Sequence, residues 1–152
     1  MLRENQALIT RRLSASPERV FAAFASADLV ARWLSPSPEV RLEVLTYDFR
    51  VHGGYRFAYH VPTGQVMHVH GFFRDIAPPT QLIFSWIIES PDEHAGIDSE
   101  VKVRITAVAG GAVLTIVHER LDRDGALERH TMGWNGAVDR LESLLDTGGV
   151  VR

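Results

Sequence analysis

Apolar residues near the start of the chain change from an alternating to a helical spacing. Residues 7–13 alternate and are predicted to form an edge strand. Ser16 is suited to cap a helix because its hydroxyl can accept a backbone hydrogen bond, and Pro17 suits the first helical position. Asp28 is the expected cap of a second short helix, which ends before Pro36. Two short helices are therefore expected after the first strand.

From Val40 onward the spacing of apolar residues changes to two, which predicts about six antiparallel strands joined by turns with glycine or proline. The alternating runs are residues 40–44, 55–61, 66–76, 81–88, 101–106 and 113–119. From Asp124 to Asp146 the helical spacing returns, with Trp134 and Leu141 on the apolar side. The pattern predicts an α+β fold of one domain, residues 1–152, in which a curved antiparallel sheet grips a long C-terminal helix.

A cavity is expected in this arrangement, because a strongly curved sheet cannot touch a straight helix along its whole length. A two-residue turn at Thr63-Gly64 would place Tyr59 opposite His68, Phe57 opposite His70 and Tyr55 opposite Phe72 on one sheet face. This aromatic face is the predicted concave side. The predicted cavity walls are Phe57, Tyr59, His68, His70, Phe72, Phe84, Trp86, Ile116, His118 and Trp134.

The opposite sheet face is then the outer one in this register. It would carry Val69 and Phe73, and apolar residues exposed there favour a homodimer that forms through this face or through an edge strand.

Composition narrows the classes of partner. The chain is 45% hydrophobic and 23% charged, which is typical of a globular protein, and its net charge of −3 gives no basic surface for nucleic acid or an anionic membrane. It has no cysteine, which excludes disulfides, thiolate metal sites and cysteine nucleophiles. Residues 1–6 are polar and lack the apolar core of a signal peptide, so a cytoplasmic location is expected.

Short motifs follow one another in a fixed order over almost the whole chain. They are Ala15–Phe21, Ala31–Trp33, Asp48–Val51 with Gly53-Gly54, Gly71–Pro79, Leu82–Trp86, His118, Gly133-Trp134 and Leu141. With them the chain resembles the family of activator of heat-shock-protein-ninety ATPase homologue-like proteins, in the START-like SRPBCC superfamily. It departs from the family at His52, where glycine more often follows, and at Leu34, where a second tryptophan is frequent.

The resemblance implies the helix-grip fold, also found in birch-pollen-allergen-like proteins, with a cavity between sheet and helix. It implies no reaction, since the superfamily contains lipid carriers, hormone receptors and polyketide cyclases, and function does not follow from fold.

His68 and His70 are the sharpest candidates for metal ligands, because alternate strand positions place both imidazoles on one face, and His118 is a candidate third ligand. No acidic residue evidently completes the set. We therefore expect no bound metal and no cofactor, and interpret both histidines as polar groups of the cavity.

Acid–base chemistry has two candidate pairs. His118 and Glu119 are consecutive on a strand and point to opposite faces, so they cannot act together. Tyr59 near His68 resembles an acid–base pair for aromatising a polyketide, although aromatic residues paired across strands usually pack.

Three functions remain open at this point. The favoured one is binding of a small hydrophobic or aromatic molecule without catalysis, since the cavity is aromatic and no nucleophile is evident. The second is a cyclase or aromatase that uses tyrosine and histidine side chains of the cavity. The third is a chaperone-interaction module, which is the weakest, because the eukaryotic ATPase activator carries a separate N-terminal domain.

Overall fold

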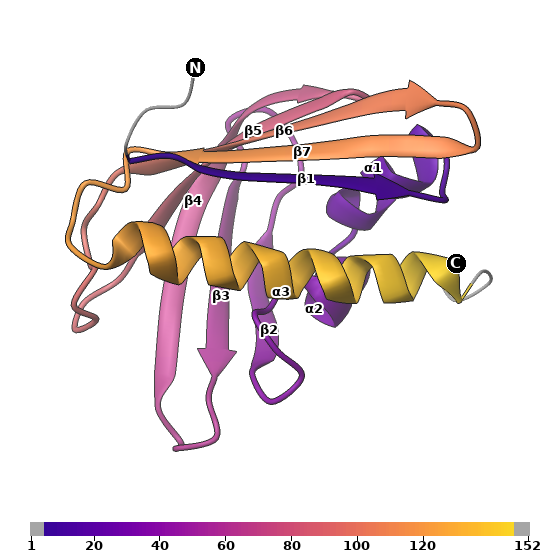
Figure 1. Cartoon of the computed structure of the whole chain (residues 1–152). Coiled ribbons are helices and arrows are strands. Elements are labelled where there is room, and N and C mark those ends of the chain that lie inside the picture. The colour runs from indigo at the N-terminus through magenta and orange to yellow at the C-terminus, as the bar shows by residue number, and fades with distance from the viewer. Residues whose placement is uncertain (1–4, 148–152) are drawn as a thin grey trace.

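A seven-stranded antiparallel sheet and one long helix make up most of the computed structural model, which describes residues 5–147 (Figure 1). The elements in chain order are β1 (Ala7–Leu13), α1 (Pro17–Ala25), α2 (Ala27–Trp33), β2 (Arg41–Tyr47), β3 (Gly54–His60), β4 (Val66–Ala77), β5 (Gln81–Ile88), β6 (Ser99–Val108), β7 (Gly111–Glu119) and α3 (Ala126–Asp146). The strand order is β1-β7-β6-β5-β4-β3-β2. The predicted helix-grip fold is confirmed.

Both short helices begin at a serine. The hydroxyl of Ser16 accepts a hydrogen bond from the amide of Arg19 at 3.2 Å and caps α1, as the sequence predicts. The hydroxyl of Ser26 does the same for Leu29 at 3.4 Å and caps α2. The prediction of Asp28 as the cap was therefore wrong: its carboxylate lies in the first turn, where it complements the positive end of the helix dipole.

The sheet curves around α3. β1 and β7 run alongside the helix, whereas β2, β3 and β4 cross it (Figure 1). One face of α3 is buried against the sheet and the short helices. The residues on this face include Trp134, Val138 and Leu141. Because the strands change direction, space opens between the first half of α3 and the ends of β3 and β4 that meet in their hairpin. These hairpin ends are called the far ends of the strands.

The register of the β3–β4 hairpin differs from the predicted one by one residue. Tyr59 pairs with Met67, Phe57 with Val69, and Tyr55 with Gly71. The loop has the odd length of residues 61–65, with Gly64 at a φ of 91°. The prediction assumed a two-residue turn at Thr63-Gly64, and a change between even and odd loop length moves every following side chain to the other face.

The concave face consequently carries Met67, Val69, Gly71 and Phe73, whereas His68, His70 and Phe72 belong to the outer face. Val69 and Phe73, predicted to be exposed, are 0% and 2% accessible. These two residues therefore cannot support dimerisation through the outer face.

Much of the concave face is filled by the protein's own aromatic side chains. Tyr55 lies 4.7 Å from Phe57 and 5.6 Å from Phe73 between ring centroids, and Phe73 lies 6.1 Å from Phe84. All four are at most 4% accessible. Such close packing leaves no room for a ligand at this end of the sheet.

Candidate functional site

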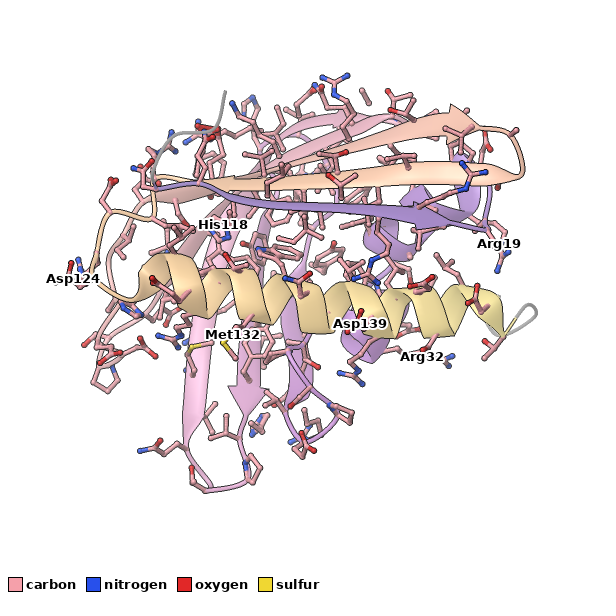
Figure 2. The ribbon with its side chains drawn as sticks, viewed as in Figure 1. Arg19, Arg32, His118, Asp124, Met132 and Asp139 are labelled. Carbon is pink, nitrogen blue, oxygen red and sulfur yellow. The ribbon has the colours of Figure 1, made fainter. Side chains whose placement is uncertain are left out.

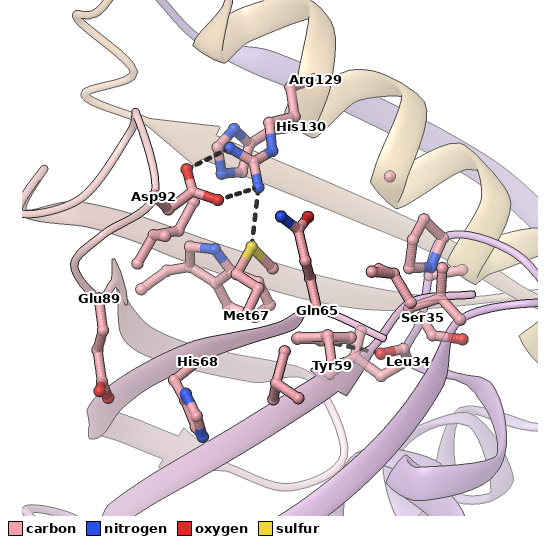
Figure 3. A pocket seen from close by; sticks show the side chains of 18 of the residues that line it. Leu34, Ser35, Tyr59, Gln65, Met67, His68, Glu89, Asp92, Arg129 and His130 are labelled. Atoms are coloured by element: carbon pink, nitrogen blue, oxygen red, sulfur yellow. Dashed lines mark hydrogen bonds and ion pairs between the residues drawn. The ribbon is translucent and has the colours of Figure 1, made fainter. Parts of the chain in front are cut away.

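A pocket of about 830 Å³ remains at the other end, between the first half of α3 and the far ends of the strands (Figure 3). Its walls come from residues 34–37 and 40 after α2, from the β3–β4 hairpin, from β5 and the loop that follows it, and from residues 129–137 of α3. Most of the buried residues that line it are apolar or aromatic, and the volume lies within the range typical of small-molecule sites.

Four of the ten predicted wall residues line this pocket: Tyr59, His68, Trp86 and Trp134. His68 lies at its edge, and its side chain and that of Glu89 point away from α3 (Figure 3).

The other six residues lie elsewhere. Phe57, Phe84, Ile116 and His118 are at most 4% accessible within the core, behind the pocket rather than on its surface. His70 and Phe72 are on the outer face, where His70 bonds to Glu89 at 2.9 Å and Phe72 packs against Arg74. The one-residue change in register is the reason for both outer positions.

His118 is a buried structural histidine with both ring nitrogens in use; Figure 2 shows it between the sheet and α3. Trp134 Nε1 donates to its Nδ1 at 3.0 Å, so Nδ1 is the unprotonated nitrogen. Its Nε2–H then donates to the Ser99 hydroxyl at 2.8 Å, and Ser99 donates onward to the carbonyl of Trp86. Burial, with the neighbouring His130 as a smaller cause, holds the pKa of His118 well below its usual range. A neutral imidazole with no free nitrogen is not positioned as a general base.

The predicted acid–base pair of Tyr59 and His68 does not form. Their side chains are on opposite sheet faces. The Tyr59 hydroxyl donates to the carbonyl of Leu34 at 3.0 Å, and burial raises the pKa of the phenol. The sheet likewise separates His118 from His68 and His70, and no group of three potential ligands gathers for a metal within residues 5–147.

His130, which the sequence analysis missed, faces the pocket from the first half of α3. Its Nδ1 lies 2.7 Å from the carbonyl oxygen of Ala126, which can only accept, so Nδ1 carries the hydrogen. Mainly through burial, the pKa of His130 is lowered, which favours the neutral ring. A signal was present, because His130 precedes Trp134 by one helical turn and shares its face.

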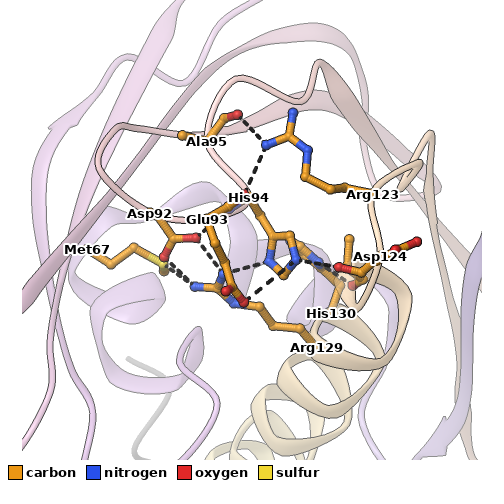
Figure 4. A network of polar contacts seen from close by, with 10 residues as sticks. Met67, Asp92, Glu93, His94, Ala95, Arg123, Asp124, Arg129 and His130 are labelled. Carbon is orange, nitrogen blue, oxygen red and sulfur yellow. Dashed lines mark hydrogen bonds and ion pairs between the residues drawn. The ribbon is translucent and has the colours of Figure 1, made fainter.

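Arg129 anchors the loop that follows β5 to α3 (Figure 4). It holds both carboxylate oxygens of Asp92, at 2.6 and 2.8 Å, and contacts Nδ1 of His94 at 2.8 Å and the sulfur of Met67. The pKa of Asp92 is lowered, chiefly by this hydrogen-bonded pair. The loop forms one end of the pocket, so the ion pair helps to fix the shape of that wall.

Two glycines of α3 have opposite surroundings. A methyl group at Gly136 would overlap the carbonyl of Pro36, so glycine is required there for the loop to pack on the helix. At Gly133, one turn earlier, a methyl group would meet no atom within 4 Å, and this residue lines the pocket. Glycine inside a helix costs about 0.5–1 kcal/mol relative to alanine, and here no close neighbour accounts for that cost.

No helix in the described part of the chain is long and apolar enough to cross a membrane.

Several solved structures share this fold. A protein from Chromobacterium violaceum is 27% identical, with a TM-score of 0.84 over 92% of this chain and 96% of that protein. The AHSA1 protein from Silicibacter pomeroyi is 22% identical, with a TM-score of 0.80 over 93% and 98%. DynU16, from the dynemicin biosynthetic locus, is 20% identical with a TM-score of 0.75; the match covers 99% of this chain and 50% of DynU16.

Among curated proteins no match is found. The family described as Activator of Hsp90 ATPase homolog 1-like protein matches residues 14–146, in agreement with the motifs, the strand order and the long helix. The chain belongs to this family of Activator of Hsp90 ATPase homolog 1-like proteins.

Proposed function

We propose that this protein binds a small, neutral and largely apolar molecule in the pocket between α3 and the far ends of the strands. The observation that carries the proposal is the pocket of about 830 Å³ itself, which remains open although the rest of the concave face is packed solid. Its mouth is apolar too: Val66 and Met132 line it and are 41% and 74% exposed. Apolar surface removed from water by a ligand would supply about 25 cal/mol per Å² before the costs of binding.

The charged side chains of the pocket wall are already paired, which favours a neutral ligand. Arg129, the cation of the pocket wall within the described residues, already holds Asp92 with two hydrogen bonds. Glu89 is held by Arg56 and His70 on the outer face. An anionic or cationic ligand would have to compete with one of these pairs.

Gly133 provides a direct test. Leucine there would project into the open space and reduce the pocket volume, whereas alanine would add one methyl group and serve as the matched control. The neutral fluorophore N-phenyl-1-naphthylamine should bind the wild type and the Gly133→Ala variant, and bind Gly133→Leu at least tenfold more weakly. Native mass spectrometry of protein purified directly from cells should show a co-purifying small molecule that the leucine variant lacks. Equal probe affinity in all three proteins would refute binding in this pocket.

A second candidate is an acid–base enzyme, for which the specific observation is His130. Its Nδ1–H is fixed by the Ala126 carbonyl, so Nε2 is the basic nitrogen of a neutral ring in the pocket wall. A general base needs this combination of fixed tautomer and neutral charge. If the molecule that co-purifies with the wild type is consumed in solution, and His130→Gln binds it without consuming it, the second function replaces the first.

A further inference from the structure

Five buried side chains of the pocket wall carry a nitrogen or oxygen atom. They are Ser35, Tyr59, Trp86, His130 and Trp134. Three are committed within the protein: Ser35 accepts from Arg140, Tyr59 donates to the Leu34 carbonyl, and Trp134 donates to His118. The two that keep an unused polar atom are Trp86 and His130.

Trp86 holds an unpaired donor. The residue is 8% accessible, and its Nε1 has no hydrogen-bond partner within residues 5–147; no other buried side-chain nitrogen or oxygen in this range is left unpaired. A buried polar group without a partner destabilises the folded state, and such a group in a native structure calls for an explanation. The indole is part of the pocket wall, so an acceptor on a bound molecule would supply the missing partner.

His130 holds the complementary acceptor. Because Nδ1 donates to the carbonyl of Ala126, Nε2 of the neutral ring has a lone pair, and no hydrogen bond to it forms within residues 5–147. The two side chains also belong to one cluster of rings, since His118 lies 5.9 Å from Trp86 and 4.7 Å from His130 between centroids.

We propose that Trp86 and His130 are the polar recognition pair of the pocket, and that the bound molecule is a neutral apolar compound with a hydroxyl group. Its oxygen accepts from Nε1 of Trp86, and an O–H donates to Nε2 of His130. Solvent does not reach Nε1 in this arrangement, so a wall side chain shifts as the oxygen enters. Met67 lies in the same wall with Arg129 on its sulfur, and an unbranched thioether adapts readily to such a shift. This inference rests on the proposed binding function.

Three naphthalenes of nearly equal size separate the two hydrogen bonds. 2-Naphthol carries an acceptor and a donor, 2-methoxynaphthalene carries an acceptor only, and 2-methylnaphthalene carries neither. Isothermal titration calorimetry on the wild type should rank their affinities in this order. Each step should be about three- to tenfold, which corresponds to one net hydrogen bond of about 0.5–1.5 kcal/mol.

Each of two variants should remove one of these differences in affinity. Trp86→Phe keeps an aromatic wall without the donor, so the methoxy and methyl compounds should bind equally. His130→Leu removes the acceptor, so naphthol should lose its advantage over the methoxy compound. Ile88→Val, another wall residue, is the control that should change all three affinities by the same factor and keep their order.

The outcomes separate the inference from the function beneath it. If all three compounds bind the wild type with equal affinity, the recognition pair is refuted while apolar binding stands. If none binds, the proposed function fails and the inference with it. The ranking in the wild type decides the matter even where a variant does not fold.

Discussion

The indole nitrogen of Trp134 on α3 donates a hydrogen bond of 3.0 Å to Nδ1 of His118 on β7, and this bond ties the helix to the sheet at the back of the pocket. Both residues are at most 4% accessible. The bond fixes the tautomer of His118 and leaves its other nitrogen for Ser99. A residue that is a catalytic candidate in the sequence is thus a structural link in the fold.

Replacing His118 with leucine should destabilise the protein by about 1–3 kcal/mol, because the Trp134 N–H is left buried without an acceptor. The double variant His118→Leu/Trp134→Phe removes donor and acceptor together. It should be less destabilised than the sum of the single variants, and urea unfolding of all four proteins measures this coupling. Additive losses would contradict a stabilising bond.

The lowered pKa values of His118 and His130 predict a dependence of stability on pH. Both side chains take up a proton more readily in the unfolded chain, where their pKa is near 6.5. Their contribution to the free energy of unfolding is therefore fully present above pH 6.5. It is lost as the pH falls below 6.5, by up to about 1.4 kcal/mol per pH unit for each histidine. The decline ends at the lower folded-state pKa.

Unfolding in urea at pH 7, 6 and 5 tests this. Three carboxylates have a lowered pKa, Glu39, Glu89 and Asp92, and their contribution to stability is lost only at more acidic pH. The difference in stability between the wild type and His130→Gln isolates the contribution of His130. A difference that stays constant from pH 7 to pH 5 would show that its pKa is not lowered by folding.

Alanine at the two glycines of α3 should have opposite effects. Gly133→Ala should raise the free energy of unfolding by about 0.5–1 kcal/mol, because the helix gains a better former and the methyl group meets open space. Gly136→Ala should lower it by about 1–3 kcal/mol, because the helix must move away from the carbonyl of Pro36. Thermal unfolding of both variants is the measurement, and shifts of the same sign would be inconsistent with this packing.

The ion pair between Asp92 and Arg129 should act locally rather than on global stability. Asp92→Asn removes the charge that Arg129 binds, and the loop at residues 89–98 should open more often. Global stability should change by about 1 kcal/mol or less, since the pair is partly exposed. Hydrogen exchange of the loop amides measures the opening. Asp98→Asn is the control, because this exposed side chain lies in the same loop and takes no part in the Arg129 contacts, so exchange should be unchanged.

The sequence was sufficient for the fold but not for the site. Ser16, the alternating strands and the apolar face around Trp134 are local signals, and each predicted its element. Which β4 side chains face the site depends on the number of residues in the loop between β3 and β4. Residue composition does not determine whether a loop such as residues 61–65 has an odd or an even number of residues. That single step moved His70 and Phe72 out of the predicted cavity.

The size of the cavity was beyond sequence reasoning for a different reason. Phe57 and Phe84 were assigned to the correct side of the sheet, yet neighbouring rings fill the space beside them. Whether a concave surface is packed or open depends on the summed volumes of side chains from distant segments, which no local pattern records. His130 could be predicted from its spacing to Trp134, since a residue four positions earlier on a helix shares the same face.

Adjacent phenylalanines on β4 test the register itself. Phe73 is 2% accessible and packs among Tyr55, Phe49 and Phe84, so Phe73→Ala should cost about 3–5 kcal/mol. Phe72 is 38% exposed on the outer face, with the guanidinium of Arg74 4.9 Å from its ring centre. Its replacement by alanine loses that contact and part of the buried surface, and should cost about 2 kcal/mol or less, which is below the loss at Phe73. Urea unfolding of the two variants decides between the registers, because a hairpin with the two-residue turn at Thr63-Gly64 would reverse the order of the losses.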